Sequence, residues 1–372
     1  MASSYIRKRN KKYTAILEVG RDSATGKKIQ KSLGSFKTKK EADIVLTAAM
    51  AKVNNGDFIL PQKMKVKDFL NTWLETYAKN LSPTTYNGYK IIVNNHLNPA
   101  FGELEIQKLQ PIHLQQYYNA KSETLKGKTL IQHHRVFRKA LDYAWKNQLI
   151  TKNPADMVDA PKVKKYTSTV LTPSQAKQLL TAVKNTRFEA PVNLGLSLGL
   201  RRGEILGLRW CDIDFINKIV NIEQTLVVAN KELIFKEPKT EGSKRSISAP
   251  LELLKILSNH KKLQNELCLR SGGAFNNKRD LVCTRDNGDP INPSSFSCAF
   301  GDFIKRYDLP HFRLHDLRHT NATFMLLTGT SAKVASNRLG HSTINITMDL
   351  YSHVLKDMNE DAADRLNDVI YK

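Results

Sequence analysis

The segment Gly199-Leu-Arg-Arg-Gly-Glu-Ile-Leu-Gly-Leu-Arg-Trp210 concentrates arginine, glycine and a glutamate within one short stretch. Three later segments have a similar polar character: Pro238-Lys239-Thr-Glu-Gly-Ser-Lys244-Arg245, Leu314-His315-Asp-Leu-Arg318-His319, and Leu339-Gly-His341, which is followed ten residues later by Tyr351-Ser-His353. Taken together, these four segments contain the parts of a phosphoryl-transfer site that works without a metal ion.

The chemistry of these residue types supports that interpretation. Two arginines can present planar forks to the non-bridging oxygens of a phosphodiester. His315 and Arg318 are three residues apart and share one face if they lie on a helix. A lysine in a hairpin can donate a proton, and a tyrosine can attack phosphorus to form a covalent ester. No cluster of carboxylates is available for Mg²⁺, so arginines would carry the role that metals have elsewhere.

Each residue also has a simpler explanation. On this explanation, Arg201 is a surface arginine, Lys239 is a turn residue and Tyr351 is a half-buried tyrosine. His315 and His319 have the i, i+4 spacing of zinc ligands, but no HExxH glutamate or third ligand is nearby. The simpler explanations are weaker for the four segments together than for any one of them.

The charge of the chain indicates a polyanionic partner. The 372 residues carry a formal net charge of +23, and residues 1–60 alone contain 13 Lys and Arg against 5 Asp and Glu. DNA or RNA is the expected partner, with a merely soluble basic protein as the alternative. The sequence contains no run of about 18 apolar residues, so no membrane span is predicted. No secretory signal is expected either. The four cysteines form no CxxC pair, which favours reduced thiols in a cytoplasmic protein.

The N-terminal segment predicts a small sheet followed by one helix. Residues 5–36 read as short strands, and Thr38-Lys-Lys-Glu41 is a capping box that opens a helix ending near Gly56. A cluster of basic residues beside this sheet predicts DNA binding, with an ordinary solvated face as the alternative. The cluster comprises Arg7, Lys8, Arg9, Lys11 and Lys12.

Two further regions follow. Residues 64–160 have apolar side chains at helical spacing and predict an all-helical domain whose aromatic residues form its core. A linker with the basic residues Lys162, Lys164 and Lys165 leads to a capping box at Thr172. Strands are expected at 219–222, 233–235 and 245–248, joined in one three-stranded antiparallel sheet, and the remainder is expected to be helical.

The order GLRxGE, hairpin lysine, HxxR, LGH and tyrosine resembles the tyrosine recombinase (phage integrase) family, most closely the integrases of phages and conjugative transposons. The resemblance covers the whole chain. It implies a multidomain fold, mainly α with small β-sheets: an arm-type DNA-binding domain at 1–60 with a three-stranded sheet plus helix, a helical SAM-like core-binding domain at 64–160, and a mixed α+β catalytic domain at 166–372.

The resemblance also implies a role for each site residue. Arg201 and Arg318 would clamp the scissile phosphate, and His341 would hydrogen-bond it. Lys239, preferred over Lys244, would protonate the leaving 5′ oxygen. His315 would assist proton transfer at the nucleophile Tyr351, and Glu204 would order the site through His315.

The implied activity is site-specific recombination that integrates or excises a mobile element through a 3′-phosphotyrosine link and a Holliday junction, with no ATP, metal or other cofactor. The implied partners are double-stranded DNA at core and arm sites, an excisionase and a host DNA-bending protein. An apolar stripe at 354, 358, 362 and 366 predicts a C-terminal helix that is exchanged within a homotetramer or packs on its own domain. The alternatives are a type IB topoisomerase, a non-catalytic DNA-binding protein on the same fold, and a chromosome-dimer resolvase.

Overall fold

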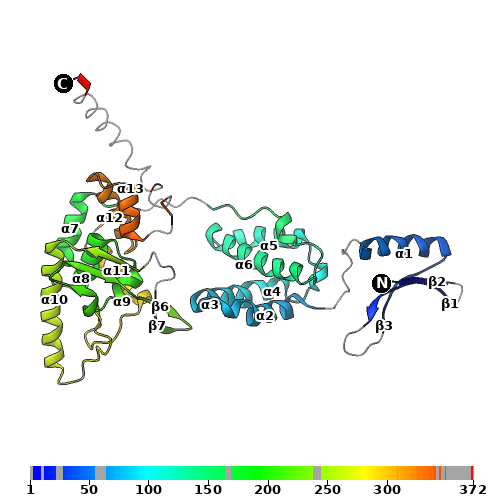
Figure 1. Cartoon of the computed structure of the whole chain (residues 1–372), viewed down its shortest axis with the longest axis horizontal. Helices are drawn as coiled ribbons and strands as arrows, with labels where there is room; N and C mark the ends of the chain where they lie inside the picture. The colour runs from blue at the N-terminus through cyan, green and yellow to red at the C-terminus, as the bar shows by residue number, and fades with distance from the viewer. Residues whose placement is uncertain are drawn as a thin grey trace. The chain divides into compact units, whose positions relative to one another are not determined.

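The computed structural model describes residues 3–9, 12–21, 28–54, 64–163, 169–237, 244–307 and 309–340, together with 343, 344, 348, 370 and 371. The chain separates into two compact units, Met1–Lys165 and Tyr166–Lys372. Figure 1 shows the helices and strands of each unit. Within the described ranges, no helix is long and apolar enough to span a membrane.

The N-terminal segment is an antiparallel sheet of three strands in chain order, covered on one face by a helix (Figure 1). The strands are β1 (Ser3–Arg9), β2 (Lys12–Arg21) and β3 (Lys28–Phe36), and the helix is α1 (Lys39–Asn54). Ala15 of β2 packs against Ala42 and Leu46 of α1 to form a small core. The predicted capping box is present in part, since the Glu41 backbone N–H donates to the Thr38 hydroxyl at 3.2 Å.

The next segment is helical, as expected from its periodicity. Its helices are α2 (Val66–Thr76), α3 (Pro83–Ile92), a π-turn (Val93–Leu97), α4 (Asn98–Phe101), α5 (Pro111–Ser122) and α6 (Gly127–Lys146), with 3₁₀ turns at Ala78–Asn80, Ile106–Lys108 and Pro154–Met157. The aromatic residues form the core, as predicted: Trp73 and Phe137 are fully buried in one cluster with Leu97 and Leu141.

The second unit is mainly helical, with strands inserted between two groups of helices. The helices are α7 (Pro173–Val183), α8 (Glu189–Leu198), α9 (Arg202–Gly207), α10 (Leu251–Arg270), α11 (Pro293–Arg306), α12 (Asp316–Leu327) and α13 (Ala332–Leu339), with a 3₁₀ turn at Trp210–Asp212. The strands are β4 (Ile213–Asp214), β5 (Ile219–Ile222), β6 (Thr225–Ala229), β7 (Glu232–Lys236) and β8 (Arg245–Ser248).

The predicted three-stranded sheet at 219–222, 233–235 and 245–248 is wrong in its composition. The sheet is β4-β5-β8, while β7 pairs with β6 in a separate two-stranded ribbon. Asn230 and Lys231 both have positive φ, 52° and 66°, in the two-residue loop between β6 and β7. Such a loop joins adjacent strands directly, so 233–235 pairs with the strand just before it, which the sequence analysis did not assign.

Candidate active site

A tight turn between α8 and α9 sets the position of Arg201. Gly199 ends α8 in the left-handed region, with φ of 64°. A Cβ at this position would lie 2.3 Å from Leu339 Cδ2 and 2.7 Å from Asn321 Oδ1. Only glycine satisfies both the conformation and the close approach. The backbone is extended at Arg201, which is the N-cap residue of α9.

Glu204 lies in the first turn of α9 and binds two arginines. Its Oε2 accepts from the Arg201 backbone N–H at 2.9 Å, and its Oε1 accepts from Arg201 Nη1 at 2.8 Å. Arg245, the first residue of β8, donates from Nη2 to Oε2 at 2.9 Å and from Nη1 to Oε1 at 3.3 Å. Burial would raise the pKa of the Glu204 carboxyl, but Arg245 and then Arg201 outweigh it and hold that pKa below its usual value. Glu204 is therefore ionised at neutral pH.

Arg318 of α12 is the most deeply buried arginine of the group, with 2% of its surface exposed. Its Nη1 donates to the Gly199 carbonyl at 2.8 Å and its Nη2 to the Leu339 carbonyl at 2.5 Å. Burial, followed by the charge of Arg201, lowers the pKa of the Arg318 guanidinium to about 9. Arg318 therefore remains charged at neutral pH and is held by backbone atoms from two other parts of the fold.

His315 lies immediately before α12, which begins at Asp316. The residue is exposed to solvent. The protein atoms around the ring, followed by the charges of His319 and Arg318, hold the pKa of the His315 imidazole below its ordinary value. The ring of His319 stands edge-on to it, with 5.1 Å between centroids. His315 is therefore a neutral imidazole at neutral pH, which can accept a proton.

Three arginines bind the carboxyl end of α13. Arg245 Nε donates to the Arg338 carbonyl at 2.9 Å, Arg318 Nη2 to the Leu339 carbonyl at 2.5 Å, and Arg201 Nη2 to the Gly340 carbonyl at 2.6 Å. These carbonyls lack partners within the helix, and the helix dipole makes that end negative. We call Arg201, Arg245 and Arg318 the arginine collar.

The structure brings together several of the predicted site residues. Arg201, Glu204 and Arg318 belong to one network, and His315 lies three residues before Arg318. Among the described residues, Glu204 is bonded to Arg201 and Arg245 rather than to His315, so the expected route from Glu204 through His315 is replaced by direct contact with the arginines.

Other predicted residues fall outside the described part of the chain. These are Lys239, His341, Tyr351, Lys11, Lys164 and Lys165. Lys244, the alternative to Lys239, is described: its Nζ lies 3.0 Å from Glu237 Oε2 and 3.9 Å from Glu223 Oε2. Two carboxylates near its ammonium group favour the charged form, which suits a surface ion pair.

Arg245 is not among the predicted site residues, although it lies in one of the four polar segments of the sequence. A signal was available in the alternation of β8, where Ile247 is buried and 246 and 248 are exposed. Side chains two residues apart point to the same face of a strand. An arginine on the inward face of a strand needs an acceptor there, and this would have indicated that Arg245 is part of the buried network.

Other predicted DNA-binding residues lie at the surface of the first unit. Arg7, Lys8, Arg9 and Lys12 are exposed. Arg7 pairs with Thr14 and Arg9 with Lys12 across β1 and β2, whereas Ile6 pairs with Ala15 on the face that α1 covers. Because side chains alternate along a strand, Arg7, Arg9 and Lys12 occupy the face opposite α1.

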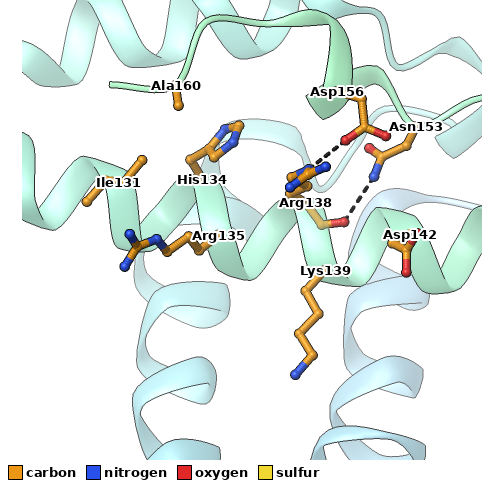
Figure 2. Close-up of a pocket in the computed structure, with 9 residues that line it drawn as sticks. All are labelled: Ile131, His134, Arg135, Arg138, Lys139, Asp142, Asn153, Asp156 and Ala160. Carbon is orange, nitrogen blue, oxygen red and sulfur yellow. Dashed lines mark hydrogen bonds and ion pairs between the residues drawn. The ribbon is translucent and has the colours of Figure 1, made fainter. Parts of the chain in front are cut away.

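The helical segment has a basic pocket of about 520 Å³ along α6 (Figure 2). Arg135, Arg138 and Lys139 line it, and the Arg138 side chain is paired with Asp156 at 2.5 Å. Lys162, a predicted DNA-binding residue, lies near the start of the same helix: a Cβ added at Gly127 would be 2.3 Å from the Lys162 carbonyl. Within the described residues, no group of three or more His, Cys, Asp or Glu side chains could hold a metal ion.

Comparison with known proteins agrees with this arrangement. The phage integrase family model matches residues 169–358, a phage integrase N-terminal SAM-like domain matches 65–122, and an arm DNA-binding domain matches 4–52. A "Tyrosine recombinase XerC-like" protein of Caldanaerobacter subterraneus subsp. tengcongensis is 29% identical, over 99% of this chain and 98% of that protein. The ICEBs1 integrase of Bacillus subtilis is 25% identical, over 97% of this chain and 98% of its own length.

Solved structures show the same fold. The Tn1549 transposon integrase in complex with transposon right-end DNA aligns with a TM-score of 0.70 and 22% identity, covering 82% of this chain and 99% of that chain. A lambda integrase tetramer bound to a Holliday junction aligns with a TM-score of 0.60 and 17% identity, covering 93% and 94%.

Proposed function

The chain belongs to the phage integrase family of tyrosine recombinases, and from this premise we propose how its own residues break and rejoin DNA. Tyr351 attacks the scissile phosphorus and the bond from phosphorus to the 5′ oxygen breaks. The products are a 3′-phosphotyrosyl link and a free 5′ hydroxyl. The bond energy is kept in the new ester, so rejoining is the reverse reaction on a partner strand.

The observation that carries this proposal is the unbalanced charge of the arginine collar. Glu204 binds Arg201 and Arg245, whereas the described hydrogen bonds of Arg318 go to backbone carbonyls, and Arg245 and Arg318 are 7% and 2% exposed. Arg201 is the accessible member, with 36% of its side chain exposed. The exposed guanidinium of Arg201 beside buried positive charge suits a phosphodiester, and it suits the more negative transition state better.

The remaining roles concern protons. The Tyr351 hydroxyl must lose a proton as it attacks, and the neutral imidazole of His315 is able to accept it. The departing 5′ oxygen must gain a proton, which Lys239 supplies as ammonium. His341 follows directly after Gly340, whose carbonyl is bound by Arg201, and it donates a hydrogen bond to the phosphate.

We propose three domains, at 1–60, 64–160 and 166–372. The three family matches, at 4–52, 65–122 and 169–358, support this division because each lies within one of them. The basic sheet face of Arg7, Arg9 and Lys12 would bind arm sites. The α6 surface with Lys162 would bind the core site together with the catalytic domain, and Lys164 and Lys165 would extend that contact.

The assembly that acts would be a homotetramer on two duplexes. It would be held by exchange of the C-terminal helix and would work in the cytoplasm on a mobile element and its target. An excisionase and a host DNA-bending protein would set the direction of the reaction. The tetrameric lambda integrase on a Holliday junction is the structural relative that supports this proposal.

The test is covalent trapping on a core site. A duplex nicked beside the cleavage point releases a short strand after attack, so that the covalent complex accumulates and is seen on a denaturing gel. We expect an adduct in the presence of EDTA that disappears in Tyr351→Phe and persists in Tyr371→Phe, since Tyr371 is an exposed tyrosine near the end of the chain. An adduct that survives Tyr351→Phe would contradict the assignment of the nucleophile.

A further inference from the structure

Arg245 is a buried cation that gives most of its donors to other parts of the site. Its side chain is 7% exposed. Nη1 and Nη2 donate to the two oxygens of Glu204, and Nε donates to the Arg338 carbonyl. These bonds alone use three of the five N–H groups of a guanidinium. Arg245 is therefore committed to protein acceptors and has little capacity left for a ligand.

Glu204 lies between two guanidinium groups. Oε1 accepts from Arg201 Nη1 and from Arg245 Nη1, and Oε2 accepts from the Arg201 backbone and from Arg245 Nη2. A carboxylate held on one side only would keep freedom of rotation, whereas contact from both sides fixes it. The position of the Arg201 fork therefore depends on Arg245, although the two arginines come from different elements.

Arg245 also fixes the chain after Lys239 and before His341, two of the predicted site residues. It is the first residue of β8, six positions after Lys239, and it is paired with Ile222 of β5. Its bond to the Arg338 carbonyl holds the end of α13, three residues before His341. One side chain thus connects Glu204, the strand that follows Lys239 in the sequence and the helix that precedes His341.

Stability alone does not account for this residue. Replacing a buried ion pair by apolar side chains is often neutral or stabilising, because the charges lose their hydration. A buried arginine that binds in three directions is well suited to fix geometry, and a displacement of about 1 Å at a catalytic group can cost roughly a hundredfold in rate.

We propose that Arg245 is a positioning residue of the strand-cleavage site, acting through Glu204 on Arg201 and through the end of α13 on His341. This inference rests on the proposed function and adds a residue to it.

The test is the single-turnover rate of covalent cleavage, measured over a range of protein concentrations. Arg245→Lys keeps a positive charge but loses the planar fork. We expect its maximal rate to fall about tenfold to a hundredfold, while the protein concentration at half-maximal rate changes by less than about threefold, and we expect Arg245→Gln to be slower still. A residue that only stabilised the fold or bound DNA would change the half-maximal concentration or the melting temperature instead.

The matched control is Arg209→Lys. Arg209 binds the buried Asp212 through its backbone N–H, Nε and Nη2, at 3.1, 2.9 and 2.6 Å, which is the same i, i+3 arrangement as Arg201 with Glu204. It belongs to the same unit but not to the arginine collar. We expect Arg209→Lys to cleave at the wild-type rate, so that loss of an arginine fork from a buried carboxylate is by itself excluded as the cause.

A double variant tests the route through Glu204. Arg245→Lys combined with Glu204→Gln should be slower than either single variant, because Arg245→Lys also loses the bond to the end of α13, but the combined loss should be smaller than the product of the two single losses, because both changes break the link through Glu204. Losses that multiply would overturn the route through Glu204, and a wild-type rate for Arg245→Lys would overturn the whole inference. If Arg245→Lys fails to fold, Glu204→Gln alone tests the link, and a wild-type rate there overturns it. A wild-type protein without a Tyr351-dependent adduct would instead overturn the proposed function, and this inference with it.

Discussion

Replacing Gly199 by alanine should destabilise the catalytic unit through two separable effects. The first is conformational: a residue with a Cβ at φ of 64° costs about 1–2 kcal/mol. The second is steric, since the new Cβ would lie 2.3 Å from Leu339 Cδ2. Leu339 is fully buried and cannot move aside freely, so overpacking adds about 1–3 kcal/mol. Adding these two ranges, we expect Gly199→Ala to lower the free energy of unfolding by about 2–5 kcal/mol.

Two other glycines of the same unit separate these effects. Gly329 has φ of 83° and nothing within 4 Å of an added Cβ, so Gly329→Ala should show only the conformational cost. Gly301, inside α11, has neither a positive φ nor a neighbour within 4 Å. Gly301→Ala should be neutral or stabilise the unit by up to about 1 kcal/mol, because alanine favours a helix.

Thermal unfolding of the full-length variants, followed by circular dichroism, is the measurement. The expected order of melting temperature is Gly301→Ala at or above wild type, then Gly329→Ala, then Gly199→Ala, with the last lower by several degrees. Equal stability of Gly199→Ala and Gly329→Ala would refute the close approach of Leu339 to this turn. Because Leu339 also supplies a carbonyl to Arg318, Gly199→Ala should slow covalent cleavage more than Gly329→Ala does.

Three further predictions concern the arginine clamp, the N-terminal domain and a buried histidine. Arg201→Lys should lower the cleavage rate by about a hundredfold or more with DNA binding retained, because the planar fork is lost; a normal rate would remove Arg201 from the site. Deleting residues 1–60 should spare cleavage of a core site and impair integration between complete sites, and unchanged integration would refute the arm-domain assignment. Burial, followed by His96 and Lys121, lowers the pKa of His133 to about 4. Between about pH 6.5 and 4 the unfolded chain therefore binds a proton that the folded chain does not, and the free energy of unfolding decreases as the pH is lowered through that window. His133→Gln should weaken this dependence in urea unfolding, and an unchanged dependence would contradict the burial of this imidazole.

Local signals in the sequence predicted the local structure well. The capping box at Thr172 is complete: the Gln175 N–H donates to the Thr172 hydroxyl at 3.2 Å, and the Thr172 N–H donates to Gln175 Oε1 at 2.9 Å. Such motifs depend on atoms a few residues apart, so the sequence alone specifies them. The helical segment was predicted correctly for the same reason, since apolar spacing within one helix identifies its buried face.

Strand pairing was predicted less well because it depends on partners outside the strand. The apolar stretch from 225 to 229 fits a strand or a buried helix segment equally by composition. The structure pairs it with β7 and places it against α9, where a Cβ at Gly203 would be 2.4 Å from Thr225 Oγ1. Glycines at 203 and 207 permit this approach of helix and strand, and their spacing does not reveal which strand they face.

The contacts of the arginine collar lie beyond any local signal, since Arg201 and Gly340 are separated by 139 positions. The sequence indicates which side chains bear the chemistry, but the acceptors are backbone carbonyls, which every residue possesses. These acceptors explain how the two arginines proposed to clamp the phosphate stay fixed near a third one before DNA binds. Glu204 cancels one of the three positive charges, and the helix end contributes about half a negative charge. The net charge of these groups is then about +1.5. Repulsion within the collar is weaker than among three bare guanidinium groups, but the net positive charge still exceeds the single negative charge of a phosphodiester. A pentacoordinate transition state carries a second developing negative charge, and the positive charge left over after the first attracts it. By this charge balance the collar binds the transition state more strongly than the substrate, which is the condition for catalysis.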